Sequence, residues 1–526
     1  MSQSTEKEPR DSEGNTTLDT SPKQSVSVDH VPHAQDHPGE EKSEMENENK
    51  PDASPERSEF DVFWTEPAAE DPENPMSWSS KRKWTIMSMV SFVTFLTPLA
   101  SSMFAPGVPH VLKEFESSSQ TLAAFVVSVY ILGFAFGPLV IAPMSEYSGR
   151  VVVYNICNVL FVVFNIISAV SKNMAMLVVF RFLAGFAGVA PITCGGGTIA
   201  DIMPTEKRGV AMALFSLGPL FGPIIGPVVG GYLVEATSWR WVFWVLSIAS
   251  GVITIVFYFV VKETYAPVLL ERKAAQLRKS TGNNAYQSRL SSGMPPKQLF
   301  FQSVVRPSKM LLFSPIITMM CIYIAVLYGL LYILFTTFTF VFEGQYHFST
   351  GAAGLSFLGS GVGMLLGLSY IASLSDRAIK KKISQNQIPK PEDRLGLHMV
   401  LPGSLSIPIG LFIYGWTTEK LVHWIVPEIG CAMLGFGMIV IMMCIQTYLV
   451  DAYTIHAASA TAASTVLRSL VGALLPLCGL KLYDAIGLGW GNSLLAFIAL
   501  ALAPIPGLFH VFGERVRTSP RFTVKF

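Results

Sequence analysis

Two arginines lie deep inside long apolar stretches of this 526-residue chain. Arg181 belongs to the stretch 174–200 and Arg468 to the stretch 457–483. If these stretches cross a membrane, a charge at that depth is costly and is a functional hypothesis by default. Both arginines are therefore candidates for coupling or substrate contact. Arg181 could instead make a purely structural bond between helices, and Arg468 could pair with Glu146 or with a substrate.

Acidic partners for these arginines are scarce. The first apolar helix, from Trp84 to Pro109, contains no Asp or Glu, so a proton-carrying acid is not apparent there. The other ionisable residues of the apolar stretches are near the ends, where we expect them to be solvated. They are Glu343, His347, Glu428, Lys481 and Asp484.

Aromatic residues are concentrated in the stretch 311–341. Tyr328, Tyr332 and Phe335 are the candidates for a substrate surface, because aromatic faces suit flat lipophilic molecules and cations. The alternative is that many of these side chains face lipid. The further members of the group are Tyr323, Phe338, Phe340 and Phe342.

The elements that position these residues are apolar runs, each long enough for the roughly 20 residues that a membrane helix needs. The predicted fold is an all-α membrane protein with twelve transmembrane helices in two pseudo-symmetric six-helix bundles. The twelve runs are 85–108, 121–143, 151–171, 174–200, 209–234, 240–261, 311–341, 350–374, 396–416, 423–450, 457–483 and 488–512.

The polar segments complete the predicted organisation. Residues 1–70 are expected to be a disordered tail, because they hold too few apolar residues to offset the entropy of ordering. The first six-helix half covers 71–261, a central loop covers 262–310, the second half covers 311–513, and a short tail covers 514–526. The stretches 71–84 and 263–275 are expected to form an amphipathic or helical element on the cytoplasmic face.

Lysines and arginines indicate the orientation. They gather at 81–83, 150, 207–208, 262–309, 377–394 and 515–521, whereas the alternate loops contain few of them. Cytoplasmic loops carry the excess of basic residues. Both termini and the central loop are therefore predicted to be cytoplasmic, in an integral protein of the plasma membrane or, as the alternative, of a vacuolar or vesicular membrane.

An internal repeat supports two related halves. The second run ends with Gly137 and, nine residues later, Glu146; the eighth ends with Gly367 and, nine residues later, Asp376. Between them an alanine and a serine recur at the same offsets. Parallel halves of this kind are found in one large class of transporters.

The segment from Gly137 to Arg150 has the pattern G-P-L-x-x-A-P-x-S-E-x-x-G-R. It resembles the loop signature of the major facilitator superfamily in its fungal drug:proton antiporter form. Gly149 suits a tight turn, and Glu146 and Arg150 could form charge pairs that break and remake as the halves move. The family usually has a second basic residue next, where this chain has Val151.

The fifth run carries a second family pattern, G-x-x-x-G-P-x-x-G-G. Its members are Gly222, Gly226, Pro227, Gly230 and Gly231. Glycines four residues apart clear one face of a helix for close packing. In the family this element is associated with export, and an arginine at the place of Arg181 with proton coupling. The resemblance covers roughly 70–515, including fingerprints at 71–84 and 263–275.

Composition excludes other classes. Half of the residues are hydrophobic, 14% are charged, and the net charge is +1, which argues against a nucleic-acid partner. The six cysteines lie in apolar runs and are expected to be small buried hydrophobes. No phosphate-binding loop, metal-ligand spacing or nucleophile motif occurs, so we expect no enzyme activity, no cofactor and no metal.

The leading hypothesis is a monomeric transporter that exports a small lipophilic drug, toxin or secondary metabolite by proton antiport with alternating access. Its expected partners are that substrate, protons and membrane lipid. Facilitated uptake of a nutrient such as a sugar is one alternative. A non-transporting sensor on the same fold is the other, and it would need a long folded cytoplasmic domain.

Overall fold

A computed structural model of the chain describes residues 60–518, except 66, 68–70, 291–295, 386–389 and 454–455. Most of the predicted tail 1–70 lies outside these residues, as does 519–526. The first group of elements is β1 (Asp61–Val62), η1 (Pro75–Ser77), α1 (Ser80–Ser102), η2 (Ala105–Gly107), α2 (Val108–Glu114), α3 (Gln120–Ser148), α4 (Arg150–Ala169), α5 (Met174–Gly188), α6 (Ala190–Ile202), α7 (Thr205–Ala236) and α8 (Arg240–Val260).

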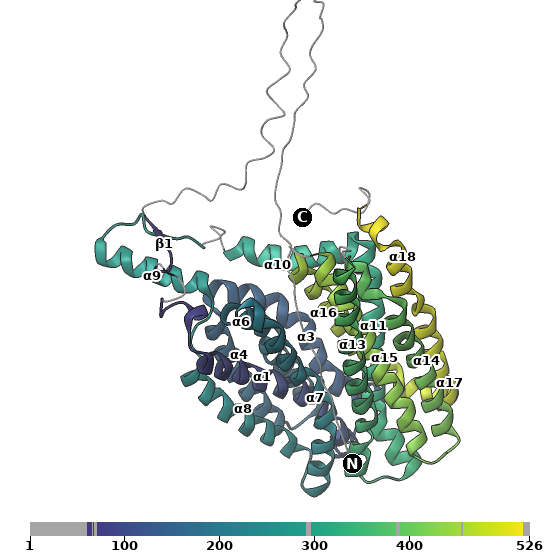
Figure 1. Cartoon of the computed structure of the whole chain (residues 1–526). Helices are drawn as coiled ribbons and strands as arrows, with labels where there is room; N and C mark the ends of the chain where they lie inside the picture. Colours follow the sequence, from purple (N-terminus) through teal and green to yellow (C-terminus); the bar gives the residue numbers. More distant parts are fainter. Residues whose placement is uncertain are drawn as a thin grey trace, which may run out of the picture. The chain divides into compact units, whose positions relative to one another are not determined.

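The remaining elements follow in chain order (Figure 1). They are α9 (Ala266–Thr281), β2 (Gln287–Ser288), α10 (Pro296–Phe313), α11 (Pro315–Tyr346), α12 (Thr350–Leu355), α13 (Phe357–Ser384), η3 (Pro391–Leu395), α14 (Leu397–Glu419), α15 (Ile425–Ala452), α16 (Ala457–Leu474), η5 (Leu475–Cys478), α17 (Gly479–Leu502) and α18 (Pro504–Thr518). The described chain is thus almost entirely helical, and the all-α prediction is confirmed.

Side-chain caps and apolar composition explain where the helices begin. Ser119 and Asn173 accept hydrogen bonds from the Leu122 and Met176 amides at the starts of α3 and α5. Such caps satisfy backbone donors that a helix leaves without partners at its first turn. The apolar residues that follow are long enough to cross a bilayer, so each cap marks the start of a span.

The described residues contain eleven helical segments long and apolar enough to span a membrane. The last of them, Ala457–Thr518, has 62 residues, far more than the roughly 20 that one crossing of a bilayer needs. The chain reverses within it at Gly487, whose φ of 81° lies in the left-handed region. This segment therefore holds two crossings, in agreement with the twelve predicted helices.

Glycines bring neighbouring helices together in both parts of the bundle. A Cβ on Gly137 of α3 would collide with Val189, and one on Gly185 of α5 would collide with the Tyr130 carbonyl. Gly367 of α13 likewise faces Ile439 of α15, and Gly363 faces the Ala432 carbonyl. The two repeat glycines, Gly137 and Gly367, thus serve the same purpose, close helix contact.

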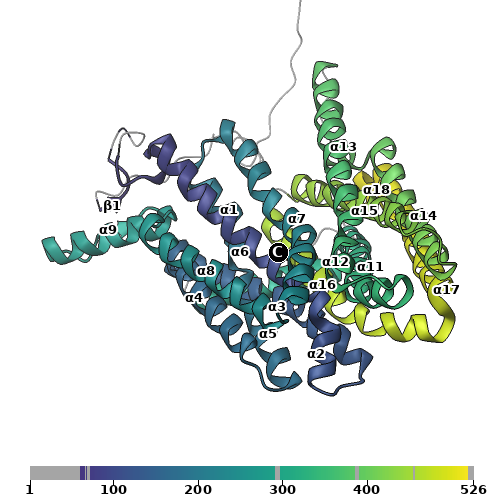
Figure 2. The same cartoon turned by 90° about the horizontal axis from the view of Figure 1, so that it is seen from below.

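Contacts between the first six and the last six spans run mainly through α3 with α16 and α7 with α12. In Figure 2 α7 lies beside α12. Ser128 of α3 donates a hydrogen bond of 2.7 Å to the Ala473 carbonyl of α16. These helices hold the two parts of the bundle against each other.

Ordered structure begins before the predicted end of the tail. β1 pairs in parallel with β2, with Asp61 opposite Gln287. Trp64 is buried, and Asp71 accepts hydrogen bonds from both the amide and the hydroxyl of Thr65. Burial disfavours the charge of Asp71, but hydrogen bonds from Thr65 and Glu73 and the nearby Lys273 outweigh it and lower the pKa of Asp71 to about 2.

The central segment therefore contains defined structure that packs on the residues before α1. Lys273 of α9 is 3.6 Å from the Asp71 carboxylate and 3.0 Å from that of Glu73. Of the two stretches expected to form an amphipathic or helical element, 263–275 is helical from Ala266 onward, in α9. The two family fingerprints, 71–84 and 263–275, thus contact each other.

Candidate functional site

Arg181 is enclosed by helices of the first six spans. Its side chain is only 1% exposed, and one guanidinium nitrogen donates to the carbonyls of Ser101 in α1 (3.3 Å) and Val127 in α3 (3.4 Å). Three aromatic rings surround the guanidinium at 4.6, 5.5 and 5.7 Å from their centroids: Phe104, Tyr130 and Phe243. Cation–π attraction and carbonyl oxygens together replace water around the charge.

Among the described residues, no carboxylate forms an ion pair with Arg181. The first apolar helix offers no acid to Arg181, and within the described part of the chain no other helix supplies one. The bonds from α5 to α1 and α3 match the structural alternative considered for this residue. A role in coupling stays a prediction.

Arg468 of α16 has a different environment. It is partly exposed, and its guanidinium lies 5.3 Å from the Tyr328 ring of α11. One terminal nitrogen is 3.9 Å from the Met442 sulfur of α15, and Nε is buried without a hydrogen-bond partner. The contacts of Arg468 are with Tyr328 and Met442 rather than with Glu146, which is exposed.

The candidate aromatics form a continuous row. The ring centroids of Tyr328 and Tyr332 are 5.1 Å apart, and those of Tyr332 and Phe335 are 5.6 Å apart. The Tyr332 hydroxyl lies 3.4 Å from Ser101 of α1, so the row reaches the other six spans. Tyr332 and Phe335 are each 2% exposed and contact protein instead of lipid, whereas Tyr328 is partly exposed.

Gly149 forms the turn between α3 and α4 as predicted. Its φ is 101°, a value that L side chains rarely adopt, and any Cβ there would strike the Glu263 carboxylate. Glu263 accepts hydrogen bonds from the Arg150 and Val151 amides at 2.9 and 3.2 Å. This carboxylate, which lies 113 residues further along the chain, caps the N-terminus of α4, where negative charge is favourable.

Arg150 pairs with Asp201 at the end of α6, and its Nε is 3.5 Å from the carboxylate. The guanidinium also donates to Ser145 and lies 4.6 Å from the Tyr265 ring. Burial, together with the Glu146 charge and against the effect of Arg150, raises the pKa of Tyr265. In this structure Arg150 is therefore bound within the first six spans and pairs with Asp201 instead of Glu146.

Sequence reasoning missed three members of this network. Asp201, Glu263 and Tyr265 lie far from Arg150 in the chain, and only the fingerprint at 263–275 pointed toward two of them. The second copy of the motif ends at Asp376, which belongs to α13 and whose side chain lies outside the described part of the structure.

The glycine pattern of α7 uses two faces of that helix. Gly222, Gly226 and Gly230 face α1, where a Cβ would collide with Leu99, Ser102 and Met103 respectively. Gly231 faces Thr350 and Gly351 of the last six spans, and the Pro227 carbonyl contacts Gly354. The motif thus packs one helix tightly against its own part and against the other part.

Polar contacts join the two parts at the end of the bundle away from the basic loops, which we call the opposite end. Glu235 accepts hydrogen bonds from the Gly351 amide (2.7 Å) and the Ser349 hydroxyl (3.0 Å). Gln120 donates to Asp484, and His110 lies 3.3 Å from the Thr350 hydroxyl. Together with Gly231, these contacts close the opposite end.

Glu428 departs from the expectation for residues near helix ends. Although it lies in the first turn of α15, its Oε1 is fully buried with no hydrogen-bond partner. The carboxylate occupies the space left by Gly359, where a Cβ would collide with it. Glu343 also departs from the expectation, because its Oε1 is buried without a hydrogen-bond partner, whereas His347, Lys481 and Asp484 are exposed, as expected.

The cysteine expectation holds for five residues and fails for one. Cys157, Cys194, Cys321, Cys431 and Cys444 are buried, whereas Cys478 is exposed. Cys478 is the last residue of the 3-10 turn η5, which follows the end of α16.

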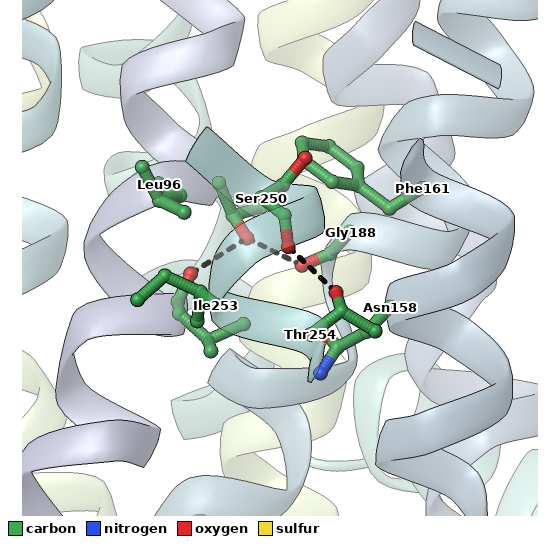
Figure 3. Close-up of a pocket in the computed structure, with 9 residues that line it drawn as sticks. Leu96, Asn158, Phe161, Gly188, Ser250, Ile253 and Thr254 are labelled. Atoms are coloured by element: carbon green, nitrogen blue, oxygen red, sulfur yellow. Dashed lines mark hydrogen bonds between the residues drawn. The ribbon is translucent and has the colours of Figure 1, made fainter. Parts of the chain in front are cut away.

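A small cavity lies between α1, α4, α5 and α8 (Figure 3). It offers about 10 Å³ to the centre of a water molecule, so it can hold one water at most. Asn158, whose side-chain nitrogen is buried without a partner, lines it with Ser250 and Thr254. A site for one water molecule suits the orphaned amide but not a transported compound.

In this chain, apolar spans enclose charged side chains at mid-depth, and the bundle is closed at one end. These are features of a membrane transporter. The model of the Major Facilitator Superfamily matches residues 90–476, and the chain belongs to that family. It is 55% identical over 465 residues to the MFS-type transporter penM of Penicillium rubens, covering 88% of this chain and 91% of that protein. It is 49% identical over 464 residues to the efflux pump radE of Floropilus chiversii, covering 88% and 86%.

Solved structures agree on the fold. A bacterial homolog of the human lysosomal transporter Spinster, in an inward-facing conformation, gives a TM-score of 0.61 at 11% identity and covers 84% of this chain and all of that one. The xylose transporter XylE from E. coli, partially occluded and inward open, gives 0.59 at 16% identity over 85% and 100%. From its family and its similarity to the fungal transporters, the chain is a membrane efflux transporter acting on a small molecule.

Proposed function

We propose that this transporter exports small lipophilic compounds, such as a drug, toxin or secondary metabolite, in exchange for protons. Two six-helix halves alternate access to a site between them. The protein works as a monomer in the lipid of the plasma membrane, with both termini in the cytoplasm.

The closed opposite end is the observation that carries this proposal. Glu235, Gly231 and Asp484 contact the other part of the bundle there. The basic loops lie at the other end, and basic loops favour the cytoplasm. A state closed on the outside is the one that an exporter needs in order to load substrate from the cell.

Proton exchange needs a carboxyl group inside the spans. Glu428 supplies one in the first turn of α15, and its Oε1 is buried without a hydrogen-bond partner, which makes it the candidate proton carrier. Arg181 lacks an acid partner, so in this proposal it holds α1, α3 and α5 together while protons pass elsewhere.

The test uses purified transporter in proteoliposomes with an imposed pH gradient and the lipophilic dye Nile red. We expect accumulation of dye to follow the gradient in wild type and to lose that dependence in Glu428→Gln. The matched control is Glu116→Gln, because Glu116 is an exposed carboxylate in the turn between α2 and α3 at the same end. Dye transport that ignores the gradient in wild type would overturn proton antiport.

A further inference from the structure

Arg468 is a charge inside the bundle without an anion. Among the described residues, no carboxylate lies within ion-pairing distance of its guanidinium. Its contacts are a ring face and a methionine sulfur, and a thioether is a weak acceptor. A guanidinium carries five donors, so most of its hydrogen-bonding capacity is unused.

The position of Arg468 favours contact with a transported molecule. α16 packs against α11 in its own part and against α3 in the other. One turn further along α16, Gly472 lets Tyr328 approach, with Ile131 of α3 close by. Arg468 therefore lies where the two parts meet, beside the partly exposed end of the aromatic row.

A charged side chain inside the bundle costs free energy unless other groups satisfy it, so a ligand that pairs with Arg468 would be stabilised there. A buried arginine normally pairs with an acid or with backbone carbonyls, as Arg181 does with Ser101 and Val127. A bound anion would supply the acceptors that the protein does not. A carboxylate matches the planar guanidinium with two parallel hydrogen bonds.

We propose that Arg468 and Tyr328 form an anion-binding subsite and that the exported compounds are lipophilic organic acids. The ionised group binds the guanidinium, and the apolar body lies against the Tyr328 ring. This inference rests on the proposed export function and adds the chemical class of its substrate.

The first test compares an acid with its neutral ester. Purified full-length transporter is titrated with 9-anthracenecarboxylic acid and with its methyl ester, and binding is followed by thermal shift. We expect the acid to bind at least about ten-fold more tightly, as loss of a charge-assisted hydrogen bond implies. Equal affinities, or no binding of the acid, would overturn the proposal without any mutation.

The second test changes the arginine. Arg468→Gln should lose the preference for the acid, whereas Arg468→Lys should keep only part of it, because the charge remains but the two parallel hydrogen bonds of the guanidinium do not. Arg272→Gln serves as the control, because Arg272 is exposed on α9. A folded Arg468→Gln protein that binds the acid as wild type does would contradict the inference, and Arg468→Lys decides if the glutamine variant does not fold.

Nile red separates this inference from the export function. If wild type transports Nile red but shows no preference for the acid, the substrate class is wrong and export stands. If wild type transports neither Nile red nor 9-anthracenecarboxylate in proteoliposomes, the export proposal itself fails.

Discussion

The two intramembrane arginines of this transporter have opposite surroundings. Arg181 is sealed at 1% exposure, with carbonyls and three rings around it, whereas Arg468 is partly exposed, with one ring and one sulfur. The Nε of each arginine is buried without a hydrogen-bond partner, but the protein gives the first guanidinium two carbonyl acceptors and three ring faces, and the second one ring and one sulfur. An arginine that makes its hydrogen bonds within the protein stabilises the bundle, whereas an arginine with few protein partners is suited to bind a ligand.

The largest effect is expected where the charge is sealed. Arg181→Ala should lower the free energy of unfolding by roughly 3–5 kcal/mol, because it removes two charge-assisted hydrogen bonds and leaves a cavity between three helices. Thermal unfolding of the purified variant in detergent measures this loss. A melting temperature equal to that of wild type would erase the distinction between the two sites.

Lysine substitutions sharpen the comparison. Arg181→Lys should cost about 1–3 kcal/mol, because an ammonium cannot present planar donors to two carbonyls and stack among three rings. Arg468→Lys should leave stability nearly unchanged and should weaken acid binding only in part, because the ammonium keeps the charge but not the planar pair of donors. Melting temperatures and titrations of both variants with 9-anthracenecarboxylate test this, and an equal loss at the two sites would count against it.

The ring beside the open arginine should affect binding more than stability. Tyr328→Leu removes the ring face against which the apolar body of the ligand lies, an aromatic contact worth about 0.5–1.5 kcal/mol, so acid affinity should fall several-fold. Tyr328→Phe keeps the ring face and is the matched control. Unchanged affinity in the leucine variant would place the ligand away from this ring.

The smallest effect is expected on the stability of the open site. Arg468→Gln should change the free energy of unfolding by less than about 1 kcal/mol, because the residue has no ion pair to lose. Thermal unfolding without ligand measures it. A loss as large as that of Arg181→Ala would show that Arg468 is structural.

Local patterns predicted most of the architecture. Apolar length identified the crossings, including the two that run on through Gly487, because each span must satisfy its own backbone in lipid. Gly149 was predicted as a turn and adopts a positive φ. These properties depend on residues close together in the chain.

Pairings across the chain were not predictable in the same way. Arg150 was expected to form charge pairs, but its partners Asp201 and Glu263, which lie far along the chain, were not predicted. Glu428 was expected to be solvated, but Gly359 on another helix makes room for its carboxylate. Position relative to a helix end says nothing about what the neighbouring helix leaves open.

The sequence alone determined that this chain crosses a membrane about twelve times, that two arginines lie within the spans, and that the first helix offers no acid. Only the tertiary structure decided that Arg181 is enclosed and that Arg468 remains accessible. The reason is physical: the cost of a buried charge is set by the groups that surround it, and those come from helices distant in the chain.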